Sequence, residues 1–182
     1  EGKYWKNNVP VTLGTTGTYL YATAIFVAGN DVYVLGDDNS GGANAIKLWK
    51  NGTATTISSG PNTFFSEGLF VSGNDVYVTG YEYDGINPII PRLWKNGIPI
   101  PLTLNNAGAQ SYCLFVIGND VYIGGFEVNP ANNHWVAKYW KNGTPVSLTD
   151  GTKDAVINCL FVDGNDVYAG GYEEASPGRK SA

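Results

Sequence analysis

The 182-residue sequence has few of the side chains on which enzymes and metalloproteins depend. It contains no methionine, one histidine (His134), two arginines and two cysteines. A Ser-His-Asp or Cys-His system would have to use His134, and two arginines cannot form the arginine triad of a sialidase. Zinc-ligand clusters are absent from the sequence, and two cysteines cannot form a disulfide framework. We therefore expect a protein that is not an enzyme and that has no catalytic residues, metal or cofactor.

Charge and long apolar runs are also scarce. Charged residues make up 15% of the chain, against the usual quarter, and the formal net charge is −5. This acidic balance argues against nucleic acid as a partner, because phosphates require a basic face. No membrane span and no signal peptide are predicted. Because the chain has no methionine and starts with glutamate, we expect a processed, partial or engineered chain.

A fourfold repeat stands out against these absences. The sequence is rich in glycine and tyrosine, with 24 and 12 residues, which is typical of strands and turns. The frame Phe-Val-x-Gly-Asn-Asp-Val-Tyr occurs four times, at intervals of 44, 45 and 46 residues. Its copies start at Phe26, Phe70, Phe115 and Phe161. A Trp-Lys-Asn motif lies 21 residues before each copy, and a glycine lies 10 residues after each start. All variation in length therefore falls in one segment, which is typical of a packed repeat with one functional edge.

Each repeat has room for four strands. Residues 155–162 and 167–170 predict the first two strands, and residues 137–141 and 145–149 of the preceding repeat predict the third and fourth. Asn142-Gly143 is a strong hairpin signal between the third and fourth strands. Helical periodicity is absent. Because a four-stranded meander of this length is typical of a propeller blade, we expect an all-β fold: a β-propeller with four four-stranded blades in a single domain, residues 1–182. A β-sandwich is the alternative, but it does not require one frame four times.

The predicted blades share one blade between the two ends of the chain. Its third and fourth strands come from residues 3–13, and its first two strands come from residues 155–171. The shared blade can be completed within one chain, giving a closed four-bladed ring, or by a second chain, giving an eight-bladed ring formed by a homodimer. The tryptophan of each repeat is expected to pack between blades. Small residues in the first strand, including Cys113 and Cys159, predict that it is innermost and that both cysteines are buried.

The repeat also resembles known sequences. The stretch YWKNGTPV at 139–146, followed by GNDVY at 164–168 and GYE at 171–173, resembles repeats of secreted or surface proteins of bacteria. The resemblance covers the whole chain and implies a propeller located outside the cell or on its surface. The order of strands is also remotely similar to the tachylectin-type lectin propellers, in which a Phe-rich inner strand precedes a Val-Tyr strand. This second resemblance implies a lectin-like protein but lends no binding residue.

Two columns of polar residues and one loop residue are candidates for ligand binding. The first column places one acid per blade on the rim that carries the variable segments: Asp38, Glu82, Glu127 and Glu173. The second column places unlike polar side chains between apolar neighbours in the first strands: Thr23, Glu67, Tyr112 and Asn158. Trp135 lies outside the repeat frame and is a candidate exposed aromatic. Solvated strand ends and a water-filled axis are the structural alternatives for the two columns.

The candidates suggest a carbohydrate ligand. An aromatic face covers the apolar C–H surface of a sugar, and a neighbouring acid accepts hydrogen bonds from its hydroxyl groups. We therefore expect a non-enzymatic binding module that recognises neutral glycans, or another cell-surface ligand, on the face of the variable segments. The alternative is a structural or assembly repeat protein with no small ligand, because fold alone does not decide function.

Overall fold

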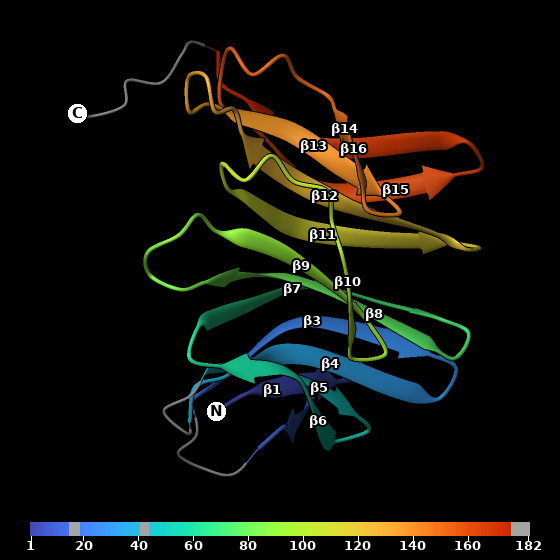
Figure 1. Ribbon diagram of the computed structural model, residues 1–182. Helices are drawn as coiled ribbons and strands as arrows, with labels where there is room; N and C mark the ends of the chain where they lie inside the picture. The colour runs from blue at the N-terminus through green and yellow to red at the C-terminus, as the bar shows by residue number, and fades with distance from the viewer. Residues whose placement is uncertain (15–18, 41–43, 176–182) are drawn as a thin grey trace.

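The computed structural model describes residues 1–14, 19–40 and 44–175, and it is built from strands (Figure 1). Within those ranges the chain forms sixteen β-strands and no helix, which confirms the predicted all-β class. It follows that none of the described residues belongs to a helix that could cross a membrane.

The strands form three complete blade-like sheets, each an antiparallel meander in chain order. The first blade consists of β3 (Leu20–Ala28), β4 (Asp31–Asp38), β5 (Asn44–Lys50) and β6 (Thr53–Gly60). The second blade consists of β7 (Thr63–Ser72), β8 (Asp75–Tyr83), β9 (Ile90–Lys95) and β10 (Ile98–Ile100). The third blade consists of β11 (Ala109–Ile117), β12 (Asp120–Val128), β13 (Trp135–Lys141) and β14 (Thr144–Ser147).

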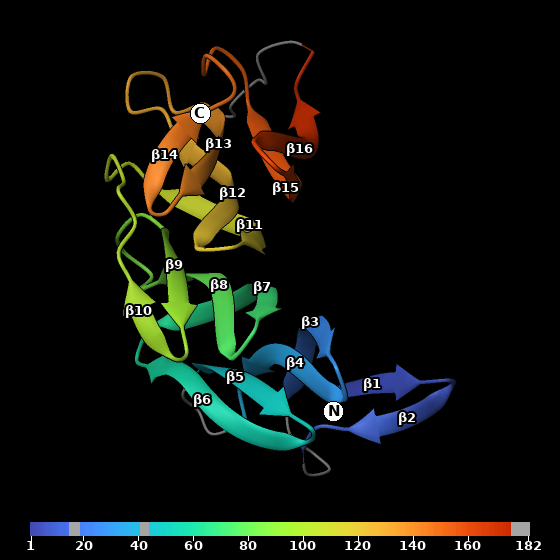
Figure 2. The ribbon, with the colours of Figure 1, turned by 90° about the vertical axis from the view of Figure 1, so that its right-hand side faces the viewer.

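Two separate two-stranded sheets lie at the ends of this row. The N-terminal half-blade consists of β1 (Lys3–Lys6) and β2 (Val9–Thr12), and the C-terminal half-blade consists of β15 (Ala155–Asp163) and β16 (Asp166–Glu173). These strands correspond to the third and fourth strands and to the first two strands of a repeat, as predicted. Figure 2 shows the sheets along an open arc with the half-blades at its two ends. The half-blades do not pair with each other within the chain, so the shared blade stays a prediction.

The repeated Asp and Lys-Asn residues join the second strand of each blade to the turn after the third. In the second blade, Asp75 forms an ion pair with Lys95 at 2.7 Å and accepts a hydrogen bond from the Asn96 side chain at 2.8 Å. The Asn96 side-chain oxygen accepts a further bond from the Val76 N–H, and the Lys95 ammonium lies over the Tyr77 ring. The first and third blades repeat this arrangement, which we call the Asp-Lys-Asn clasp.

The turn residues have the backbone geometry that the sequence predicts. Asn96 and Gly97 have φ angles of 52° and 77°, and the equivalent pairs in the other blades are alike. In the N-terminal half-blade, Asn7 and Asn8 adopt 50° and 67°. Asparagine and glycine tolerate this left-handed region better than other residues, so the hairpin prediction is confirmed.

The apolar core lies between neighbouring sheets. Three of the four repeat tryptophans are 0–4% exposed, which confirms the predicted packing between blades for them: Trp49, Trp94 and Trp140. Trp5 is 65% exposed, so this prediction is wrong for Trp5 in the single chain, where no second strand lies beside β1. The innermost strands touch through a continuous row of phenylalanine rings, with centroids 4.9–5.3 Å apart: Phe26, Phe70, Phe115 and Phe161. Trp140 also donates a hydrogen bond from its indole N–H to the Thr103 carbonyl at 3.0 Å.

The end of the arc changes the environment of one cysteine. Cys113 lies half-buried in β11, and burial raises its thiol pKa to about 12. Cys159 is exposed, so the prediction that it is buried is wrong for the single chain. The physical reason is that β11 has the first strand of a further sheet, β15, beside it, whereas β15 ends the row.

Candidate functional site

Every first strand contains a β-bulge, and the bulged residue belongs to the polar column identified in the sequence. The register skips one residue in each of the four pairs of first and second strands. The skipped residues are Thr23, Glu67, Tyr112 and Asn158. Bulges re-aim side chains and are frequent beside functional sites. The polar column therefore consists of residues that the sheet ladder does not use.

A glycine column makes these bulges sterically feasible. Gly80 and Gly171 lie beside the bulges of their sheets, and a Cβ added to either would lie 2.1 or 1.8 Å from the carbonyl oxygen of Phe65 or Val156. Real Cβ atoms do not approach carbonyl oxygens this closely. The glycine at the end of each fixed spacing is thus required by the close approach of the bulged strand.

The bulge of the second blade places a carboxyl group against a buried aspartate of the first. Asp37 in β4 is 8% exposed and accepts a hydrogen bond from the Ser66 N–H at 2.9 Å. The hydroxyl groups of Thr23 and Ser66 lie 2.7 Å apart and join the same two blades. Burial raises the pKa of Glu67 to about 7, and the charge of Asp37 adds to this effect. Burial also raises the pKa of Asp37, while its bonds to Ser66 oppose the change.

Tyrosines extend this group along the arc. Burial raises the pKa of Tyr81, with further contributions from Glu67 and Asp37. Burial raises the pKa of Tyr112 to about 12, and the charges of Tyr81, Glu67 and Tyr172 act in the same direction. The Tyr112 hydroxyl donates a hydrogen bond to the Gln110 side chain at 2.5 Å. We call this set the bulge cluster: Asp37, Glu67, Tyr81, Tyr112 and Tyr172.

The cluster combines groups that suit a neutral polar ligand. The Tyr81 ring stacks on Phe65 with a centroid distance of 4.7 Å, which fixes its orientation. A carboxyl group with a pKa near 7 can donate or accept a hydrogen bond around neutral pH, and phenol groups can do both. Within the described residues, no three His, Cys, Asp or Glu side chains gather in a way that could hold a metal ion. The cluster offers hydrogen bonds and ring faces.

Three of the four rim acids form ion pairs with the third strand of their own blade. Asp38 pairs with Lys47 at 2.8 Å, and Glu82 pairs with Arg92 at 2.6 Å. Glu127 is 2% exposed; it pairs with Lys138 and accepts a hydrogen bond from the Asn105 N–H at 2.6 Å. These three acids therefore hold second and third strands together within their blades.

Glu173 differs from the other rim acids because its sheet has no third strand. It lies exposed at the end of β16 and has no ion-pair partner among the described residues. Asn158, in the same half-blade, is exposed as well. These two predicted site residues thus lie at the open end of the arc.

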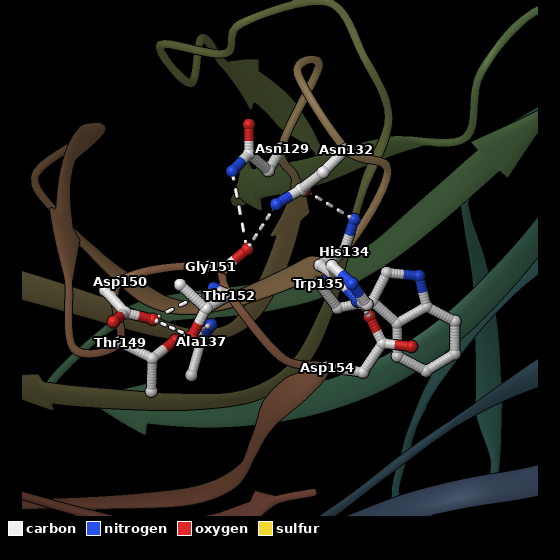
Figure 3. Close-up of polar contacts among 10 residues, drawn as sticks. All are labelled: Asn129, Asn132, His134, Trp135, Ala137, Thr149, Asp150, Gly151, Thr152 and Asp154. Carbon is white, nitrogen blue, oxygen red and sulfur yellow. Dashed lines mark hydrogen bonds and ion pairs between the residues drawn. The ribbon is translucent and has the colours of Figure 1, made fainter. Parts of the chain in front are cut away.

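Trp135 lies at the start of β13 and packs against its own blade. Its ring stacks on Phe126 with a centroid distance of 4.6 Å, and its backbone N–H donates a hydrogen bond to the Asp154 carboxylate at 2.8 Å. His134 Nδ1 lies 2.9 Å from the same Asp154 oxygen (Figure 3). The side chains of Asn129 and Asn132 point to the Gly151 carbonyl (Figure 3). Both interactions tie the variable loop of the third blade to the segment that leads into β15.

The structure therefore brings together some of the predicted site residues and separates others. Glu67 and Tyr112 lie close enough to influence each other electrostatically, whereas the rim acids are distributed one per blade. The site residues predicted from the sequence did not include Asp37, Tyr81 or Tyr172. All three follow directly after a glycine of the repeat frame, and this shared position could have identified them.

Comparisons with known proteins add no family to this picture. No family model matches the chain, and no curated protein is significantly similar to it.

Proposed function

We propose that the chain is an arc of a β-propeller and serves as a non-enzymatic binding module for neutral, hydroxyl-rich ligands such as glycans, outside the cell or on its surface. The observation that carries the proposal is the bulge column. One backbone irregularity recurs in all four first strands, yet it presents four different polar side chains. A feature that served packing alone would favour the same small residue in each repeat, as the neighbouring glycine column does.

The chemistry of the bulge cluster supports a sugar more than an ion. Two carboxyl groups in a partly buried setting disfavour phosphate, and the net charge of −5 acts in the same direction. Tyr81 and Tyr112 supply ring faces and hydroxyl groups at the same place. The cluster lies toward the ends of the strands from which the variable loops leave, so this proposal keeps the predicted face. The ion pairs of the rim acids favour Glu67 and Tyr112 over Asp38, Glu82 and Glu127 as ligand contacts.

The proposal is tested by titrating neutral mono- and oligosaccharides, monitored by calorimetry and tryptophan fluorescence. We expect saturable binding that weakens at least tenfold in Glu67→Gln and in Tyr112→Phe. Asp163→Asn is the matched control, because it removes an exposed carboxylate at the opposite end of β15. Titration of Trp135→Ala and Glu82→Gln measures whether residues at the rim also contribute to sugar binding. Absence of saturable binding to every sugar, or equal binding by all variants, would overturn the proposal.

A second candidate function is a structural or assembly repeat without a small ligand. The exposed aromatic surface at the ends of the arc favours it, since Trp5, Phe161 and Tyr168 are 57–65% exposed. Patches of this kind mark interaction sites. If no sugar binds while the chain still assembles, this candidate replaces the binding module.

A further inference from the structure

We propose that two copies of this chain associate head to tail, so that the C-terminal half-blade of each copy pairs with the N-terminal half-blade of the other. Each contact forms one composite blade with the strand order β15, β16, the partner's β1 and the partner's β2. The proposal concerns assembly and does not depend on whether a sugar binds.

The first argument is the complementarity of the two free strand edges. In each complete blade, the second strand pairs with the third, as β8 does with β9. In the half-blades, β16 lacks a third strand and β1 lacks a second strand. Exposed edges present unpaired N–H and C=O groups that invite another strand. The register of β8 and β9, which pairs Tyr77 with Lys95 and Val78 with Trp94, places Tyr168 opposite the partner's Lys6 and Ala169 opposite the partner's Trp5.

The second argument is that the Asp-Lys-Asn clasp is divided between the two half-blades. Asp166 and Tyr168 lie at the start of β16, whereas Lys6 is the last residue of β1 and Asn7 follows it in the turn. In the complete blades the same four residues form an ion pair of 2.7–2.8 Å, a side-chain hydrogen bond and a cation–π contact. Asp166 and Lys6 are exposed and have no ion-pair partner among the described residues. Pairing the half-blades would restore the clasp.

The rim ion pair is divided in the same way. Basic residues stand two positions before the tryptophan in every repeat, and three of them pair with a rim acid of the same blade. Lys3 is the fourth basic residue and Glu173 is the fourth acid. Among the described residues, the one ion pair of Lys3 is with the nearby Glu1, at 3.1 Å. The proposed register brings Glu173 to the partner's Lys3. Both ends of the arc therefore carry charges of opposite sign at matching positions.

The third argument is the apolar surface that the half-blades leave exposed. Trp5 is 65% exposed and Tyr168 is 57% exposed, whereas their equivalents in the complete blades are 0–4% and 4–7% exposed. Two open hollows of about 310 and 350 Å³ are lined in part by Tyr4, Trp5 and Ile25 at the N-terminal end. Phe161, 58% exposed, ends the row of phenylalanine rings in contact, and the partner's Phe26 would continue it.

The open arc favours a second copy of the chain, and not the chain's own other end, as the pairing partner of each half-blade. The two half-blades lie at opposite ends of the open arc (Figure 2), so one chain does not join them in this structure. A head-to-tail contact gives a closed ring only when its rotation closes. Two copies supply eight blades, which lies within the usual range of about four to eight, whereas three copies would exceed it.

Light scattering during size-exclusion chromatography tests the proposal. We expect the unmodified chain at twice its mass of 19.5 kDa. Trp5→Ser and Asp166→Lys should each shift the species to a monomer. The first removes a ring that the dimer would bury, and the second places a lysine opposite the partner's Lys6. Ile86→Ser is the matched control: Ile86 is 90% exposed and distant from both half-blades, so this variant should remain a dimer. Lys6→Asp combined with Asp166→Lys restores an opposite-charge pair and should restore the dimer.

Circular dichroism is used to check that each variant is folded. If Trp5→Ser does not fold, the charge swap between Lys6 and Asp166 still tests the proposal. The Cys159 thiol gives an independent measure: its labelling should slow as the dimer forms, because β15 then gains a neighbouring sheet. A monomer from low to high micromolar concentration would overturn the proposal. A species larger than twice the chain mass would also overturn it, since the arc would then not close with two copies.

Discussion

The complete blades and the half-blades share the residues of the repeat frame, but these residues have different surroundings. Trp140 is 0% exposed in the third blade, whereas Trp5 is 65% exposed in the N-terminal half-blade. Tyr122 and Tyr168 differ in the same way, at 4% and 57%. The repeat frame thus encodes which strands can pair, but burial requires that the neighbouring strand be present. The comparison yields four predictions, in decreasing order of expected effect.

The largest effect should separate the buried and exposed tryptophans. Trp140→Ala should lower the free energy of unfolding by roughly 3–5 kcal/mol, because it empties a fully buried site and removes the indole hydrogen bond. Trp5→Ala should change the stability of the dilute single chain by less than about 1 kcal/mol. Urea unfolding, followed by circular dichroism at low protein concentration, measures both. Equal losses of unfolding free energy in the two variants would show that Trp5 is buried in the single chain, which would contradict the comparison.

The glycine column offers the next contrast. Gly80→Ala should destabilise the chain by roughly 2–3 kcal/mol, since the added Cβ meets the Phe65 carbonyl at 2.1 Å with sheets packed on both sides. Gly171→Ala creates a contact of 1.8 Å, but β16 is a free edge that can move away. We therefore expect a smaller loss in Gly171→Ala by the same urea measurement. A larger loss there would contradict the idea that the free edge relaxes.

The bulge cluster predicts a dependence of stability on pH. The pKa of Glu67 is raised from 4.5 to about 7 on folding, so its contribution is fully present below pH 4.5 and is lost as the pH rises through 7. After allowance for solvent screening of this half-buried group, the loss is about 1–2 kcal/mol. Unfolding of the unmodified chain and of Glu67→Gln at pH 4.5 and 7.5 isolates this term. The stability difference between the two proteins should change across this range, and a constant difference would rule out the raised pKa.

The smallest contrast concerns the clasp. Asn96→Gly keeps a residue that accepts a positive φ but removes the side-chain bonds to Val76 and Asp75, which should cost about 1 kcal/mol. Asn7→Gly should cost only a few tenths in the dilute chain, where the second-strand partner is missing. Thermal unfolding at low concentration compares them. An equal effect at both positions would mean that the turn itself, and not the clasp, sets the cost.

Much of the strand pattern was predictable from the sequence because it follows local signals. The Asn-Gly turns and the alternating strands determined the position of β13 to within two residues at its start. The bulges were not predicted, because a bulge depends on how closely β7 approaches β8 and leaves no mark except the polar residue and the glycine opposite. The second strand was predicted to end at residue 170, before the frame glycine Gly171, whereas β16 continues to Glu173.

The candidate site was predictable only where one column carried the signal. Glu67 and Tyr112 were found because their column varies while its neighbours do not. Asp37 was missed because its role arises from contact between two blades, which spacing within a repeat does not report. The ion pairs of the rim acids could have been predicted from the basic residue two positions before each tryptophan. This column of basic residues indicates that the rim acids have a structural role.

Hydrogen–deuterium exchange of the two free edges tests the composite blade most directly. At high protein concentration, the amides of β16 and β1 should be as protected as those of β8 and β9, and dilution should make them exchange rapidly while the complete blades remain protected. Rapid exchange of β16 and β1 at every concentration would contradict the composite blade. Protection that does not change on dilution would show instead that each chain closes on itself.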